Sequence, residues 1–208
     1  GHVYAGEEQL VKTAGQLLEA GETAIRDTLA GMLQAEDLIL DKDAIYLPPF
    51  YHAECSTSRR LRDLAESTGR SLFDGLFDPS SLTAETGIEY DEVQLAAIRQ
   101  AVTSKVMVLT GGPGTGKTTT TQGIIAALKK AGLRVLLAAP TGRAAKRMSE
   151  ATGMEAKTIH RLLEYNPQDG YKRNDENPLE GDALIVDECS MIDILLMNNL
   201  LKAVPVGM

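Results

Sequence analysis

One short stretch constrains the fold more than any other feature, and it reads Gly111-Gly112-Pro113-Gly114-Thr115-Gly116-Lys117-Thr118. It fits the pattern G-x-x-x-x-G-K-[ST] and lies between an apolar segment, 105–110, and a segment with helical periodicity, 117–131. Glycines allow the backbone to curl so that successive N–H groups point at phosphate oxygens. A helix that follows directly presents its free N–H groups to the same anion. The stretch therefore predicts a phosphate-binding strand–turn–helix unit; the alternative is a glycine-rich turn without a ligand.

The end of this stretch carries the side chains with the expected phosphate chemistry. Lys117 would bridge the β- and γ-phosphates of a nucleotide as a point charge, and the Thr118 hydroxyl would ligate Mg²⁺. The predicted cofactors are therefore a nucleoside triphosphate and Mg²⁺. Besides Lys117 and Thr118, the predicted nucleotide site takes in Gly111, Gly112, Pro113, Gly114, Thr115, Gly116 and Thr119.

A second motif follows 70 residues after Lys117, where the apolar run 183–186 leads into Asp187 and Glu188. Parallel sheets bind their ligands at the carboxyl ends of their strands, so both carboxylates would lie where a nucleotide binds. Asp187 is suited to hold Mg²⁺ through water, and Glu188 can polarise an attacking water. An apolar strand that merely enters a loop is the alternative. The adjacent Glu favours transfer to water over transfer to a substrate hydroxyl, and so an NTPase over a kinase.

Helical and apolar segments alternate in the second half of the chain. A helix at 91–103 precedes the apolar segment 105–110, and two short helices and a polar loop at 165–181 precede 183–186. Strands that are apolar on both faces and alternate with helices indicate a parallel sheet covered by helices. The predicted fold class is therefore α/β with helices on both faces of the sheet, and its strands are 105–110, 134–139 and 183–186.

The first half has a different pattern. Apolar residues recur at helical spacing over 7–20 and 22–35, a hairpin is expected at 38–47, and another helix at 51–67. Two helices and a hairpin occur in this order in a winged-helix unit, but a small packing or interaction domain fits better because the second helix offers only Arg26 as a basic residue. The mixed Gly, Ser, Pro and Asp content of 69–88 predicts a linker. The predicted domains are thus 1–68 and 89–208, joined by 69–88.

Charge is segregated along the chain, which has a net charge of −8. Residues 1–104 carry 8 Lys and Arg against 18 Asp and Glu, whereas residues 105–208 carry 13 against 11. Within 129–161 there are 8 basic and 2 acidic residues. A polyanion responds to the local patch rather than to the chain total, so a nucleic-acid partner is compatible with this composition.

Apolar runs, the N-terminus and the cysteines indicate the cellular compartment. No apolar run approaches the roughly 20 residues that span a bilayer, and the N-terminus lacks the order of a signal peptide. Cys55 and Cys189 are the only cysteines and lie in unrelated contexts, so a disulfide framework is not expected. We therefore expect a protein of the cytoplasm without a membrane partner and without a metal site beyond Mg²⁺.

Four blocks together resemble the RecD-like DNA helicases, a branch of helicase superfamily 1. They occur in that family's order within residues 91–193, and the first half of the chain resembles the family only loosely. The blocks are GGPGTGKTTT at 111–120, APTGRAA at 139–145, TIHRLL at 158–163 and IVDECSMID at 185–193.

The resemblance implies further roles at matching positions. Gln94 resembles the glutamine that reads the adenine edge, and an amide that both donates and accepts suits adenine. Thr141, Gly142 and Arg143 resemble a block that touches the single-strand backbone, and Thr158 and His160 resemble a further DNA-contacting block. The alternatives are a solvated helix face for Arg143 and Gln94 and a core position for His160. Ile159 stands where many members of the wider superfamily carry an aromatic residue, which argues against base stacking there.

The resemblance implies an ATP-dependent DNA helicase with a RecA-like motor domain, 5′→3′ movement along single strands and a role in repair and recombination. Its partners would be single-stranded and duplex DNA and possible further repair subunits. The family also has a γ-phosphate-sensing block and a second motor domain with an arginine finger, which are expected beyond residue 208. This chain alone should therefore bind adenine nucleotide weakly, hydrolyse it barely and unwind no duplex. The alternatives are a nucleotide-gated DNA-binding module without helicase activity and a P-loop kinase.

Overall fold

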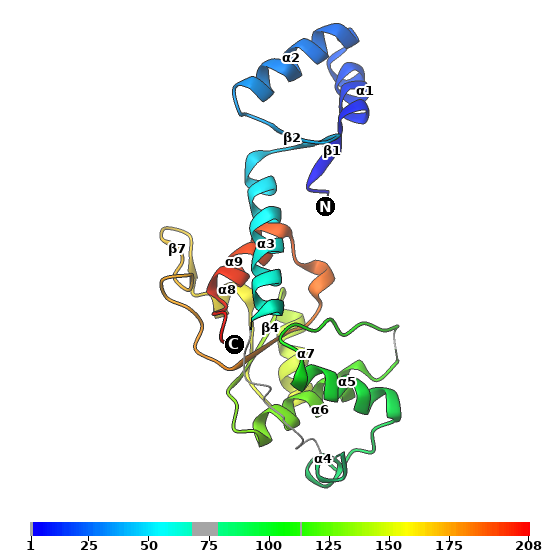
Figure 1. The fold of residues 1–208 in the computed structure, drawn as a ribbon, viewed down its shortest axis with the longest axis vertical. Coiled ribbons are helices and arrows are strands. Elements are labelled where there is room, and N and C mark those ends of the chain that lie inside the picture. Colours follow the sequence, from blue (N-terminus) through cyan, green and yellow to red (C-terminus); the bar gives the residue numbers. More distant parts are fainter. Residues whose placement is uncertain (1, 68–78, 113) are drawn as a thin grey trace. The chain divides into compact units, whose positions relative to one another are not determined.

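The computed structural model of the chain describes residues 2–67, 79–112 and 114–208. The chain divides into two compact units (Figure 1). The first combines Gly1–Arg59 with Asp193–Asn198, and the second combines Arg60–Ile192 with Asn199–Met208. None of the described helices is long and apolar enough to cross a membrane.

The first unit joins helices to a small antiparallel sheet. Its helices are α1 (Glu7–Leu18), α2 (Glu22–Gln34) and the start of α3 (Pro48–Glu66), and its strands are β1 (Tyr4–Gly6), β2 (Ile39–Asp41) and β3 (Ala44–Tyr46). The strand order is β1-β3-β2, and Tyr46 pairs with both Tyr4 and Ile39. The predicted helices and hairpin are present. Strand β1 was not predicted, because three residues are too few to show a period.

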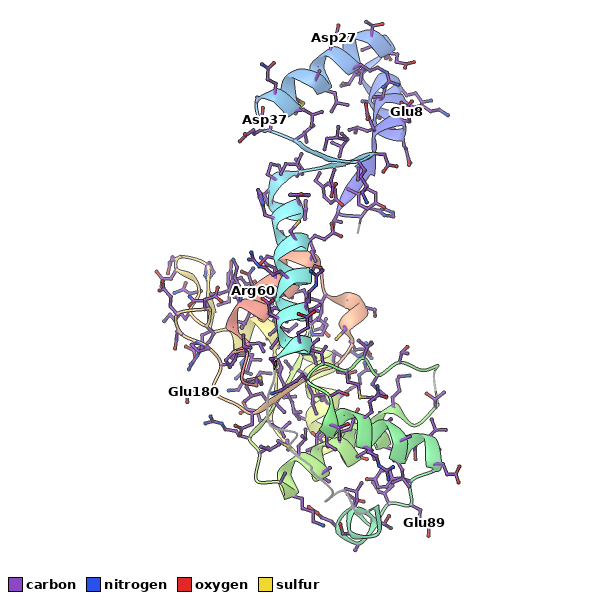
Figure 2. The ribbon with its side chains drawn as sticks, viewed as in Figure 1. Glu8, Asp27, Asp37, Arg60, Glu89 and Glu180 are labelled. Atoms are coloured by element: carbon purple, nitrogen blue, oxygen red, sulfur yellow. The ribbon has the colours of Figure 1, made fainter. Side chains whose placement is uncertain are left out.

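The core of this unit is small. Val11, Leu29 and Ile45 are buried together, one from each of α1, α2 and β3. Acidic side chains, among them Glu8, Asp27 and Asp37, project from its helices and from the turn after α2 (Figure 2). Arg26 bonds Glu8 and Glu22 at 2.9 Å each. The acidic character predicted for the first half of the chain is therefore a property of its surface.

The predicted linker 69–88 contains a helix. Residues 69–78 lie outside the described residues, but α4 spans Pro79–Thr86. Leu82 of this helix is 2% exposed and belongs to the core of the second unit. The segment was expected to be irregular because one apolar side chain per turn is too little to define a period, yet burial of that side chain is enough to place a short helix.

A parallel sheet forms the centre of the second unit. Its order is β5-β4-β8, with β4 at Val135–Ala139, β5 at Ala156–Thr158 and β8 at Ala183–Val186. Val135, Leu137, Ala138 and Ala139 are all buried, so both faces of β4 are covered. The α/β class with a helix-covered parallel sheet is confirmed.

Helices flank this sheet. They are α5 (Glu92–Thr103), α6 (Lys117–Lys130), α7 (Gly142–Thr152), α8 (Ile159–Leu162), the short 3₁₀ turn η1 (Cys189–Met191) and the end of α9 (Ile194–Ala203), whose residues up to Asn198 belong to the first unit. The main core joins Ile98 of α5, Ile124 of α6, Leu137 of β4 and Met148 of α7. Gly123 allows α5 and α6 to approach closely, because a Cβ there would overlap the Ile98 δ-methyl group.

The strand predicted at 105–110 is absent, and this prediction is wrong for the structure described. The segment has no strand assignment, and Val108 is 83% exposed. Its apolar residues satisfy the pattern of a buried strand, but a strand needs a neighbour to accept its backbone hydrogen bonds. Strand β8 pairs with β4 in the described part of the chain, and 105–110 joins neither strand.

The loop predicted at 165–181 contains a hairpin. Strands β6 (Tyr165–Asn166) and β7 (Gly170–Tyr171) pair antiparallel. Arg60, labelled in Figure 2, bonds both carboxylate oxygens of Asp175 at 2.7 Å and so holds the segment after the hairpin. Leu179 of the same segment is also buried, at 5% exposure. A distant ion pair and a buried apolar side chain leave no periodic pattern, which is why the composition of the loop predicted no structure.

Candidate nucleotide and strand site

The glycine-rich loop leads directly into α6. Gly114 and Gly116 have φ of +77° and +75°, a conformation that side chains disfavour, and Gly116 is the N-cap of α6. The Lys117 Nζ donates to the carbonyl oxygens of Gly111 and Gly112, at 2.6 and 2.7 Å. The lysine thus folds over the loop, where its ammonium group can exchange carbonyl partners for phosphate oxygens.

The first glycine of the loop has no room for a side chain. A Cβ on Gly111 would lie 2.7 Å from Thr115 Oγ1, and that hydroxyl donates to the Gly112 carbonyl oxygen at 2.9 Å. The free N–H groups at the start of α6 add the positive end of the helix dipole. These donors fit the phosphates of a nucleotide. Pro113, the remaining predicted member of the loop, lies outside the described residues.

Gln94 lies against this loop, 23 residues upstream of Lys117 in the sequence. A capping box holds it at the start of α5: its backbone N–H donates to Asp91 Oδ1 at 2.8 Å, and its Oε1 accepts from the Asp91 N–H at 3.1 Å. A Cβ built on Gly116 would lie 2.5 Å from Gln94 Nε2. The amide is therefore fixed by its oxygen and presents its nitrogen to the phosphate loop.

Two threonines complete the first turn of α6. Thr118 is exposed and Thr119 is half-buried. The next residue, Thr120, is buried, and its hydroxyl donates a hydrogen bond to the Gly116 carbonyl oxygen at 3.1 Å. Of these three threonines Thr118 is the exposed one, and its role as an Mg²⁺ ligand stays a prediction.

The two predicted carboxylates follow β8. The Asp187 N–H donates to the Ala138 carbonyl oxygen at 2.9 Å, which continues the pairing with β4. The Asp187 side chain is exposed and accepts from the Glu188 N–H at 2.9 Å. Among the described residues no hydrogen bond or ion pair joins either carboxylate to the phosphate loop.

Glu188 has an unusual backbone and an unexpected partner. Its φ is +53°, in the left-handed region that non-glycine residues rarely adopt. Its Oε1 accepts a hydrogen bond of 2.9 Å from Arg147 Nη2. Arg147 lies on α7, and the sequence did not predict this pair because a contact across 41 positions leaves no local pattern.

The residues predicted to contact single-stranded DNA lie at the carboxyl edge of the parallel sheet. Ala139 ends β4 and is in register with Thr158 of β5. Thr141 and Thr158 both act as N-caps: their hydroxyls accept from the N–H groups of Ala144 and Arg161, each at 3.2 Å. Gly142 and Arg143 are exposed at the start of α7. The hydroxyls therefore fix two helix starts side by side, next to an exposed cation.

His160 belongs to an aromatic cluster that the sequence did not predict. Its ring lies 5.5 Å from the Tyr165 ring and 6.0 Å from the Tyr171 ring, measured between centroids, and these two tyrosines on the β6–β7 hairpin lie 4.8 Å apart. His160 is exposed, so the core position considered for it is wrong, and Ile159 is the buried residue at 0% exposure. Tyr165 is 45% exposed. Aromatic surface is thus present beside β5, supplied by a different element.

Cys189 follows the two carboxylates, and its Sγ donates to the Val186 carbonyl oxygen at 3.3 Å. Partial burial of the thiol, with the nearby Asp187 carboxylate, raises the pKa of Cys189 and keeps it protonated. Within the described residues no three His, Cys, Asp or Glu side chains form a cluster that could hold a metal ion. The oxygen donors of Thr118 and Asp187 are of the kind that Mg²⁺ takes, since this ion is commonly bound by one or two protein groups together with nucleotide phosphates.

A helix-covered parallel sheet with a glycine-rich phosphate loop, its lysine, and a carboxylate pair at the end of a strand define a P-loop α/β nucleotide-binding domain. The chain belongs to the family described as an AAA domain, whose model matches residues 94–208, more than half of the chain.

Proteins similar to this chain include DNA helicases. The chain is 38% identical over 205 residues to the ATP-dependent RecD2 DNA helicase of Deinococcus radiodurans, and 40% identical over 138 residues to the RecBCD enzyme subunit RecD of Mycolicibacterium smegmatis. It is 42% identical over 107 residues to the ATP-dependent DNA helicase dda of Enterobacteria phage T4. The matches cover 94%, 54% and 48% of this chain. The resemblance to RecD-like helicases is confirmed.

The chain spans only a part of each relative. The matched region is 28% of the Deinococcus protein, 25% of the Mycolicibacterium protein and 24% of the phage protein. In the Deinococcus match, 94% of this chain is aligned, so the similarity extends into the first unit.

Proposed function

We propose that this chain is the nucleotide-binding part of an ATP-dependent DNA helicase, in which ATP hydrolysis drives movement along single-stranded DNA and the separation of a duplex. The observation that carries the proposal is the geometry around α6. The phosphate loop, Lys117 and the capped amide of Gln94 converge on one helix N-terminus. That arrangement offers donors for phosphates and an amide for a base.

The proposed nucleotide contacts follow from these donors. The backbone of 111–116 and Lys117 would hold the phosphates, and Gln94 Nε2 is the group available for the base. Thr118 and Asp187 would hold Mg²⁺ together with phosphate oxygens. When bound, Mg²⁺ neutralises charge that develops on the phosphates during transfer.

Glu188 is the proposed general base. It lies two residues after the end of β8, and its side chain is 38% exposed, so a water can reach it. A carboxylate that accepts the proton of the attacking water makes hydrolysis, rather than transfer to an alcohol, the favoured reaction. A P-loop kinase would instead place a substrate hydroxyl at this position.

Single-stranded DNA is proposed to cross the carboxyl edge of the sheet. The N-termini of α7 and α8 both begin there, at Thr141 and Thr158, and helix N-termini favour phosphate. Arg143 adds an exposed cation, and the exposed face of Tyr165 can stack a base. Movement in the 5′→3′ direction, a second motor domain and a role in DNA repair rest on the resemblance and belong to this proposal.

The test uses the full-length protein. ATP turnover is measured with and without single-stranded DNA, and strand displacement is followed on a duplex with a single-stranded tail of either polarity. We expect turnover that rises with DNA and displacement from a 5′ tail only. DNA-stimulated ATP binding without turnover would instead identify a nucleotide-gated binding module, and phosphate transfer to an added hydroxyl acceptor would identify a kinase. Either result would refute the helicase proposal.

A further inference from the structure

We infer that Arg147 is a positioning residue that couples strand binding to ATP hydrolysis: it holds the Glu188 carboxylate away from its catalytic position until a DNA phosphate takes its place. The inference rests on the proposed function, and it begins from the 2.9 Å hydrogen bond between Arg147 Nη2 and Glu188 Oε1. That bond ties the proposed general base to α7, the helix whose first turn carries the proposed DNA contacts.

The bond constrains the base directly. A carboxylate oxygen that accepts from a guanidinium has fewer lone pairs to offer to a water, and its side chain is fixed in direction. The backbone of Glu188 is in the left-handed region at φ +53°, and its N–H is held by Asp187 Oδ1. With the backbone fixed, rotation of the side chain is the remaining way for the carboxylate to move. Release of Arg147 is therefore a condition for that rotation.

The position of Arg147 on α7 connects it to DNA. Arg143 and Arg147 are four residues apart, so they lie on the same helix face, and both are exposed, whereas Ala144, Ala145 and Met148 are buried on the other face. Arg143 makes no hydrogen bond or ion pair within the described residues. A DNA strand whose backbone reaches Arg143 brings its next phosphates within the range of Arg147. A DNA phosphate then competes with the Glu188 carboxylate for the Arg147 guanidinium.

The pair is weak enough to be exchanged. The Arg147 and Glu188 side chains are 64% and 38% exposed, and ion pairs at such exposure hold only a small preference for the bonded state. An exposed ion pair contributes about 1 kcal/mol at most, and a factor of ten corresponds to about 1.4 kcal/mol. Loss of the Arg147–Glu188 pair should therefore raise the population of free Glu188 by about fivefold at most. A preference of this size can slow hydrolysis without DNA and still yield to a bound strand.

The neighbouring lysine provides a matched control. Lys146 lies on the same helix and is exposed, but it pairs with Glu150 at 3.8 Å rather than with Glu188. Lys146→Gln and Arg147→Gln therefore remove the same charge from adjacent positions, and only the second releases the base. Both positions are exposed, so both variants should fold, which thermal unfolding followed by circular dichroism will verify.

The experiment measures ATP turnover by the full-length protein and the two variants, with and without single-stranded DNA. We expect Arg147→Gln to raise the DNA-free rate by about two- to fivefold and to lower the ratio of DNA-stimulated to DNA-free turnover, whereas Lys146→Gln keeps the wild-type DNA-free rate. In addition, the slope of log affinity for the strand against log salt should fall by about one for Arg147→Gln, because one phosphate contact is lost.

Three outcomes would overturn the inference: an unchanged DNA-free rate in Arg147→Gln with undiminished stimulation, an equal loss of both rates with ATP binding intact, or the same rise in both variants. Each of these three outcomes presupposes that ATP turnover by the wild-type protein responds to DNA. If the wild-type protein itself shows no DNA-dependent turnover, the proposed helicase function fails instead, and the two failures are thereby distinguished.

Discussion

Replacing Gly116 by alanine tests whether the Gln94 amide is held against the phosphate loop. Gly116 has φ +75°, and an added Cβ would lie 2.5 Å from Gln94 Nε2. Gly132 is a matched control, because its φ is +78° and a Cβ there would meet nothing within 4 Å. The two substitutions share the cost of left-handed backbone, about 1–2 kcal/mol, and differ only in the contact with Gln94.

The size of that difference follows from what Gln94 must give up. To avoid the new methyl group its side chain has to turn, which breaks the 3.1 Å hydrogen bond from the Asp91 N–H and opens the capping box. Such a bond contributes about 0.5–1.5 kcal/mol net. We therefore expect Gly116→Ala to destabilise the domain by about 0.5–1.5 kcal/mol more than Gly132→Ala, and Gln94→Ala to abolish this excess in the double variant.

The assay follows the first thermal unfolding transition of the full-length protein together with nucleotide affinity by titration calorimetry. Gly132→Ala should keep wild-type affinity for ATP, whereas Gly116→Ala should bind ATP more weakly and lose part of its preference for ATP over other nucleoside triphosphates. Equal destabilisation by both substitutions, or additive effects of Gly116→Ala and Gln94→Ala, would refute the coupling between amide and loop.

Three further outcomes are expected. Lys117→Ala removes a charge whose hydrogen bonds to phosphate are worth about 1.5–3 kcal/mol each, so calorimetry should show weaker ATP binding and a phosphate-release assay no turnover. Glu188→Gln should keep ATP binding and lose hydrolysis, whereas Asp187→Asn should raise the Mg²⁺ concentration needed for half-maximal turnover; identical behaviour in both assays would contradict the division of roles. Burial, with the neighbouring Glu54 carboxylate, raises the pKa of Tyr46 from 10.0 to about 12, so its phenol ionises earlier in the unfolded chain. Stability should therefore fall as pH rises above 10 toward 12, and in Tyr46→Phe this loss and the last step of the 295 nm absorbance titration should both diminish.

The sequence by itself determined the features that depend on neighbouring residues. The glycine-rich loop, the start of α6 at Lys117 and strand β8 with the carboxylates after it were all predicted at their observed positions. Each depends on backbone freedom or apolar periodicity within about ten residues, and such interactions are visible in a linear chain. The same locality explains the first unit, where two amphipathic helices and a hairpin were predicted in the order observed.

Only the tertiary structure decided which distant groups meet and which strands find a partner. The contact of Gln94 with Gly116 and the bond of Arg147 to Glu188 join segments that no periodicity relates, and the second lies 41 positions apart in the chain. The segment 105–110 has the composition of a strand but no partner, whereas three-residue β5 is a strand because β4 lies beside it. The physical reason is common to these cases: a ladder bond or an ion pair requires two groups within about 3 Å, and chain folding, not local pattern, brings them to that distance.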